Sequence, residues 1–169
     1  MTKKLKDLPH PDNKHFDAAE GWLELGNWKE ANEELEQITP RFRAHPYVLE
    51  MRYKIYQAAG RLEMAVEVAK GLRTILPYSP LSHIHLAFSF HELKRTKEAY
   101  DTLILVVDQF QNQWVMRYNL ACYSCQLINL KEAMEWLGKA IDLTGKKDIR
   151  LMALEDPDLE PLWAQIGEI

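Results

Sequence analysis

The stretch Lys97-Glu98-Ala99 is repeated as Lys131-Glu132-Ala133, and it also occurs as Lys29-Glu30-Ala31. With Ala65 included, these alanines stand 34 residues apart along the chain. Three more columns keep the register: Trp22, Tyr56, Phe90 and Ser124; Leu35, Ala69, Leu103 and Leu137; Ile38, Leu72, Val106 and Ala140. An ungapped period of this length indicates stacked copies of one small unit that cannot bury its apolar face alone.

The composition is that of a globular helical protein. The 169 residues are 47% hydrophobic, and the chain has only seven glycines and eight prolines. Most prolines fall between segments with helical periodicity, as expected where helices begin and end. The net charge is −4 with both signs mixed, so charge gives no argument for nucleic-acid binding.

Nothing in the sequence predicts a membrane or secretory segment. No apolar run approaches the ~18 residues that span a bilayer. The first twelve residues are polar and contain prolines, so they lack the apolar core of a signal peptide. We therefore predict a cytoplasmic protein without membrane association.

Turn and breaker residues divide the chain into helical hairpins. Gly26 and Gly60 fit the turn within a hairpin, while Pro46 and Pro80 fit the first turn of the next helix. In the tail, Pro157 ends a truncated helix, and a closing amphipathic helix is predicted from Leu159, Leu162, Trp163 and Ile166. The predicted organisation is a flexible lead (1–12), four hairpins (about 13–45, 46–79, 80–113 and 114–145) and a truncated helix with a capping helix (146–169).

The repeated positions resemble the tetratricopeptide repeat family over residues 13 to about 145. The second copy carries Leu49, Tyr53, Tyr56, Gly60, Ala65, Ala69 and Pro77; the third carries Leu86-Ala87, Phe90, Ala99 and Leu103; the fourth carries Leu120-Ala121, Ala133, Leu137 and Ala140. Ser124 and Arg52 depart from the pattern, and the segment 154–159 resembles tails of bacterial proteins of this type. The resemblance implies an all-α, right-handed α-solenoid of antiparallel hairpins.

The repeated alanines are expected where two helices cross closely, and the large apolar residues are expected to fill the space between hairpins. The predicted core therefore contains Ala31, Ala65, Ala99, Ala133, Trp22, Tyr56, Phe90, Leu35, Leu103 and Leu137.

The resemblance also implies a concave groove lined by the first helix of each hairpin. Its predicted residues are Phe16, Glu20, Tyr47, Glu50, Lys54, Ile84, His85, Phe88, His91, Tyr118, Asn119 and Cys122. This set is acidic toward the first hairpin and apolar toward the last. An exposed apolar groove with a polar rim usually marks a binding surface.

We therefore predict a non-catalytic protein–protein interaction module. Its partner would be a peptide segment with apolar anchors and a basic flank. Two other occupants of the apolar half are the closing helix and a second subunit. The alternative functions are a cytosolic chaperone similar to the tetratricopeptide chaperones of bacterial secretion systems, or a homo-oligomerising scaffold.

No catalytic, metal or cofactor motif is apparent. Cys122 and Cys125 share a helix face, and His91 stands one period before Cys125, but no fourth ligand for a zinc ion is evident. Cys122 with His91 is the one pair that offers a nucleophile and a base. We predict neither catalysis nor a metal site nor a cofactor.

Overall fold

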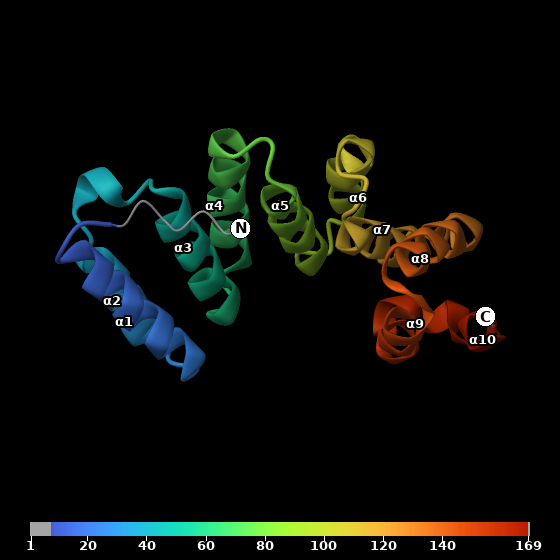
Figure 1. Cartoon of the computed structure of the whole chain (residues 1–169). Helices are drawn as coiled ribbons and strands as arrows, with labels where there is room; N and C mark the ends of the chain where they lie inside the picture. Colours follow the sequence, from blue (N-terminus) through green and yellow to red (C-terminus); the bar gives the residue numbers. More distant parts are fainter. Residues whose placement is uncertain (1–7, 169) are drawn as a thin grey trace. The chain divides into compact units, whose positions relative to one another are not determined.

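The computed structural model of the chain describes residues 8–168, and it describes the side chains of this span except those of 146 and 147. Across residues 8–168, ten α-helices and three short 3-10 helices follow one another, and no strand occurs (Figure 1). The chain divides into two compact units, Met1–Ser82 (unit 1) and His83–Ile169 (unit 2).

Unit 1 consists of two helical hairpins. The first pairs α1 (Asp12–Glu24) with α2 (Trp28–Gln37), and the second pairs α3 (Pro46–Ala58) with α4 (Leu62–Ile75). A 3-10 turn, η1 (Pro40–Phe42), connects the hairpins, and α3 also contacts both α1 and α2. The two first helices, α1 and α3, are therefore neighbours.

Unit 2 also consists of successive antiparallel helices, and a short C-terminal segment follows its last hairpin. Its helices are α5 (Pro80–Glu92, which begins in unit 1), α6 (Thr96–Ile104), α7 (Trp114–Gln126), α8 (Leu130–Thr144), α9 (Lys146–Glu155) and α10 (Trp163–Glu168), with the 3-10 turns η2 (Val107–Gln109) and η3 (Pro157–Leu162). α7 packs on both α6 and α8, and η3 packs on α7. None of the helices in the described part of the chain is long and apolar enough to cross a membrane.

The turns inside the hairpins require a left-handed backbone. Gly26 and Gly60 adopt φ values of 76° and 67°, which glycine tolerates without steric cost. In unit 2 the same role falls to Lys94 (φ 61°) and Ile128 (φ 65°). Because side chains with a Cβ resist this region, the turns of unit 2 are more strained than those of unit 1.

The predicted core is confirmed except at Trp22 and at Tyr56, which is only partly buried against the core of unit 1. The four repeated alanines and Leu35, Leu103 and Leu137 are completely buried, and Phe90 is also buried. The prediction was wrong for Trp22, whose side chain is 38% exposed. Trp22 lies in the first hairpin, and no earlier hairpin covers that face of α1 among the described residues.

The start of the described chain is packed. Of the flexible lead predicted for 1–12, residues 1–7 lie outside the described part, but Leu8 is buried in the core of unit 1. Asp12 begins α1 and is also buried. Its carboxylate accepts hydrogen bonds from the Thr39 backbone N–H at 2.6 Å and from the Thr39 hydroxyl at 3.1 Å, so it ties the start of α1 to the turn between α2 and η1.

Arg52 departs from the repeat pattern because it has a charged partner. Its Nη1 donates to Oε1 of Glu36 at 2.6 Å, and the Arg52 side chain is largely shielded from solvent.

The closing helix differs in form from the prediction, since the chain runs through η3 before α10 begins. Pro157 and Pro161 explain this because neither can donate the backbone hydrogen bond of an α-helix.

Replacing Ala99 by leucine is expected to lower the free energy of unfolding by about 1–3 kcal/mol, because the added carbons have no space at a closed helix crossing. Ala58→Leu, at the exposed end of α3, is the control and should change stability by no more than about 0.5 kcal/mol. Urea unfolding measures both. Equal midpoints for Ala99→Leu and wild type would contradict the assigned helix crossing.

Candidate functional site

A cavity of about 450 Å³ lies in unit 1 between the first helices of its two hairpins. Residues spaced three or four apart share one face of a helix, so α1 and α3 each present a row of side chains to it. The lining residues are Leu8 and Asn13, Phe16, Asp17 and Glu20 of α1, and Tyr47, Glu50, Met51 and Lys54 of α3. Five of the predicted groove residues are thus brought together: Phe16, Glu20, Tyr47, Glu50 and Lys54.

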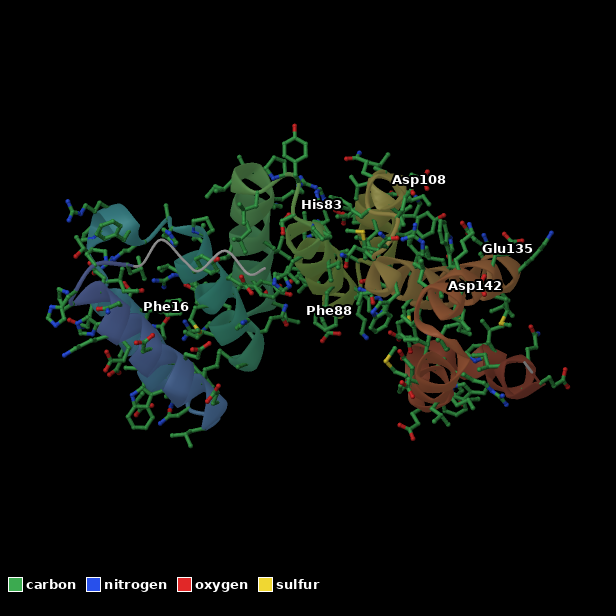
Figure 2. All side chains as sticks on the ribbon, in the orientation of Figure 1. Phe16, His83, Phe88, Asp108, Glu135 and Asp142 are labelled. Atoms are coloured by element: carbon green, nitrogen blue, oxygen red, sulfur yellow. The ribbon has the colours of Figure 1, made fainter. Side chains whose placement is uncertain are left out.

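This cavity has an apolar floor and an acidic rim. Leu8 and Met51 are buried. Phe16, labelled in Figure 2, is partly buried and packs against the core cluster that contains both residues. On the rim, Asp17 and Glu20 are exposed, and within residues 8–168 neither forms an ion pair. The remaining rim carboxylate is that of Glu50.

The lysine of the rim does not balance these carboxylates. Nζ of Lys54 lies 3.6 Å from Oε1 of Glu50, so its charge is directed at one of the three acidic side chains. With Asp17 and Glu20 added, the lining carries a net negative charge. Because the cavity is open to solvent and lined by exposed carboxylates, it favours a cationic group next to an apolar one.

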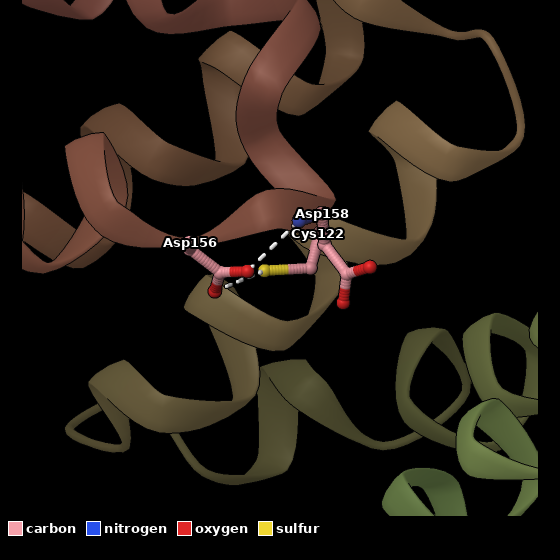
Figure 3. Close-up of side chains that lie close together, drawn as sticks. All are labelled: Cys122, Asp156 and Asp158. Carbon is pink, nitrogen blue, oxygen red and sulfur yellow. Dashed lines mark hydrogen bonds between the residues drawn. The ribbon is translucent and has the colours of Figure 1, made fainter.

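In unit 2, the chain's own C-terminal segment covers the predicted groove face of α7. The Tyr118 hydroxyl donates to Oδ2 of Asp156 at 2.8 Å. The Cys122 thiol donates to the same oxygen at 3.6 Å, as Figure 3 shows. Nε2 of His91 lies 2.8 Å from Oδ2 of Asp158. Gln126 donates to the Asp158 backbone carbonyl at 2.9 Å.

Three predicted groove residues, His91, Tyr118 and Cys122, are therefore buried beneath residues 156–162. Of the occupants considered for the apolar half, the closing segment is the one that the structure places on α7. The other predicted residues of unit 2 remain more accessible. Phe88 of α5 is 42% exposed (Figure 2), while Ile84, His85 and Asn119 are half-buried.

The Cys122 and His91 pair is not arranged for nucleophilic catalysis. Both nitrogens of His91 have other partners, since Nδ1 lies 3.1 Å from the Thr96 hydroxyl and Nε2 faces Asp158. Burial, and secondarily the Asp156 carboxylate, raise the pKa of the Cys122 thiol above its ordinary value. The thiol therefore stays protonated, and a protonated thiol is a poor nucleophile and metal ligand.

Cys122, Asp156 and Asp158 form a compact cluster, with one potential ligand atom of each within 4.8 Å of the others (Figure 3). The hydrogen bonds of these three residues explain why their side chains lie close together. Oδ1 of Asp156 accepts from the Asp158 backbone N–H at 3.0 Å and thereby caps η3. Cys125, which the sequence placed beside Cys122 as a potential ligand, is not one of the three.

Asp156 and Asp158, which hold the tail on α7, are not among the site residues that the sequence predicts. One local signal was present, because an aspartate directly before Pro157 fits the cap of a helical turn whose first residue is proline. The two aspartates have partners on α5 and α7 that are 32 to 67 residues away in the chain. No periodic pattern indicates such pairs.

No protein-family model and no curated protein matches the sequence. Solved structures match its fold. The structure titled "MamA RS-1 ArsTM double mutant" has a TM-score of 0.74 and 18% identity, covering 95% of this chain and 92% of that one. MamA residues 41 to the end from Desulfovibrio magneticus RS-1 gives 0.73 and 17%, covering 95% of both chains. A crystal structure of MamA gives 0.72 and 16%, covering 93% and 88%.

At such identities the likeness concerns the fold alone. It agrees with the all-α architecture of successive hairpins that the repeat period predicts, and that prediction is confirmed.

Tyr118→Phe should lower the free energy of unfolding of unit 2 by about 1.5–3 kcal/mol, because the lost hydrogen bond has a charged acceptor. Amide exchange in residues 156–166 should accelerate in the same variant. Tyr78→Phe is the matched control, since Tyr78 is 87% exposed. Unchanged exchange and unchanged stability in Tyr118→Phe would show that Asp156 does not hold the tail on α7.

The native thiols should react slowly with Ellman's reagent at alkaline pH and rapidly in urea. Burial raises the pKa of both cysteines, so the folded state retains thiol protons that the unfolded state loses above about pH 8.5. The free energy of unfolding should therefore fall as pH rises above that value.

Asp158→Ala should accelerate thiol labelling because it loosens the segment over Cys122. Asp142→Ala, an exposed change on α8, should leave the labelling rate as in wild type. Rapid labelling of the native wild-type protein would contradict the closed arrangement.

Proposed function

We propose that this chain is a non-catalytic protein-binding module that holds a partner segment in the cavity of unit 1. The observation that supports this most directly is the convergence of α1 and α3 on one open cavity with an apolar floor and an acidic rim. Its volume of about 450 Å³ lies within the range of about 300–1,000 Å³ typical of ligand sites. The space suits one or two large side chains of a peptide.

The chemistry of the lining defines the partner. Phe16 and Tyr47, which line the cavity and are only partly buried, offer contact area to an aliphatic or aromatic anchor above the buried Leu8 and Met51. Asp17 and Glu20 would pair with lysine or arginine side chains next to that anchor. We therefore propose a helical or extended segment in which an apolar residue is flanked by basic ones.

Unit 2 would contribute less to such binding. We propose Ile84, His85, Phe88 and Asn119 as contacts of unit 2 with a protein partner. His91, Tyr118 and Cys122 would join only after residues 156–162 had left α7. The chaperone-like and self-assembling alternatives, and the cytoplasmic location, stay predictions.

Selection from a displayed random-peptide library on the full chain tests this proposal. We expect enriched sequences that place an apolar residue within a few positions of lysine or arginine. Their affinity, measured by fluorescence anisotropy, should weaken as salt is raised, because the rim charges are exposed to solvent.

The double variant Glu20→Lys/Glu50→Lys should weaken binding about tenfold or more, which corresponds to about 1.4 kcal/mol. The control Glu33→Lys/Glu63→Lys makes the same charge change on exposed positions of α2 and α4 that do not line the cavity. Equal loss in both double variants would indicate a general charge effect. Binding unchanged by Glu20→Lys/Glu50→Lys would contradict the proposed site.

A further inference from the structure

One column of the repeat changes its chemistry in the last copy. It reads Trp22, Tyr56 and Phe90, and then Ser124. Within unit 2, the third copy shows what the aromatic residue does there. The Phe90 ring is buried, and the Arg95 guanidinium lies 4.6 Å from its centroid. Arg95 in turn donates to both carboxylate oxygens of Glu98, at 2.6 and 2.7 Å.

The fourth copy has polar residues at the positions of Arg95 and Glu98, but it has no aromatic ring at the position of Phe90. One period after Phe90, Arg95 and Glu98 stand Ser124, Asn129 and Glu132. A cavity of about 350 Å³ lies at this place, lined by Lys97, Tyr100, Ser124, Leu127, Asn129 and Glu132.

The Ser124 hydroxyl is a buried polar group that lacks a hydrogen-bond partner in the described part of the chain. Ser124 is only 1% exposed. A buried hydroxyl without a partner is costly, and most such groups in native proteins are satisfied. An incoming group that hydrogen-bonds to Ser124 would remove this cost.

Glu132, another residue of the cavity lining, is held by several hydrogen bonds. Glu132 accepts from the Tyr100 hydroxyl, from Asn129 Nδ2 at 2.6 Å and from Trp136 Nε1 at 3.3 Å. Burial, and secondarily the bond to Glu132, raise the pKa of Tyr100 to about 12, so this hydroxyl remains a donor. The carboxylate is therefore held in place by donors from α6, the turn and α8.

The size of the cavity fits a ring. An apolar cavity of about 150 Å³ is enough to hold benzene, so this one can accept a phenol or an indole. Leu127 lines the cavity and is 39% exposed, and Ile128, the next residue along the chain, is 86% exposed. Exposed apolar residues favour a ring that belongs to a larger chain, because such a chain can cover more apolar surface than a free ring.

We infer that this cavity of unit 2 binds a tyrosine or tryptophan side chain of a partner protein, whose ring occupies the place that Phe90 fills in the preceding copy. The hydroxyl or indole N–H of that side chain would hydrogen-bond to Ser124. This site is separate in residues from the cavity of unit 1, and it does not depend on the function proposed for that cavity.

Titration of the full chain with N-acetyl-tyrosinamide and N-acetyl-tryptophanamide, followed by amide chemical shifts, tests the inference. We expect saturable shifts at millimolar concentrations, concentrated in residues 97–100 and 124–132. N-acetyl-phenylalaninamide, which lacks the polar group, should bind several-fold more weakly, and N-acetyl-leucinamide should cause no saturable shift.

Two substitutions of Ser124 test whether the shifts come from binding in this cavity. Ser124→Phe should fill the cavity and abolish the shifts. Ser124→Ala changes only the hydroxyl and should remove the preference for tyrosinamide over phenylalaninamide. It also serves as the decisive variant if Ser124→Phe does not fold, which circular dichroism reveals.

The inference is overturned if no aromatic amide gives saturable shifts in these residues, or if Ser124→Ala keeps the full preference for tyrosinamide. Free p-cresol that binds more tightly than the tyrosine derivative would also overturn it, because the site would then serve a small aromatic molecule and not a partner side chain.

Discussion

The close crossing of two helices within each hairpin is the constraint on which the rest of the structure depends. Ala31, Ala65, Ala99 and Ala133 lie in the second helices of the hairpins and are completely buried, as residues at such crossings must be. A side chain with only a Cβ lets two backbones approach, and dense packing at the crossing then fixes the face that each helix presents outward. The cavity between α1 and α3 exists because both helices are oriented in this way.

The architecture was predictable because its signal is periodic. Repeated alanines and large apolar residues occur at one spacing in four copies, and each copy satisfies the same local packing. Five of the twelve predicted groove residues meet in the cavity of unit 1 for the same reason. They lie on neighbouring first helices, where helical spacing alone determines which side chains share a face.

The rest was not predictable because it depends on position within the stack or on contacts far apart in sequence. Trp22 fits the repeat, yet it belongs to the first hairpin and is partly exposed. Tyr118 and His91 also fit the groove pattern, but Asp156 and Asp158 cover them through hydrogen bonds that no periodicity encodes. Ser124 was visible as a departure from the pattern, whereas the space beside it was not.

The attachment of residues 156–162 to α7 also restricts how a chain of this kind can grow in evolution. The first helix of a hairpin packs on the second helix of the preceding one, as α3 does on α2 and α7 on α6. An additional hairpin after α8 would therefore need the face of α8 that α9 now covers, and it would have to displace the tail that Asp156 anchors. Duplication of an internal hairpin avoids this conflict, because the new copy meets surfaces that already accept a neighbour. Lengthening by insertion is therefore easier than lengthening by addition at the C-terminal end.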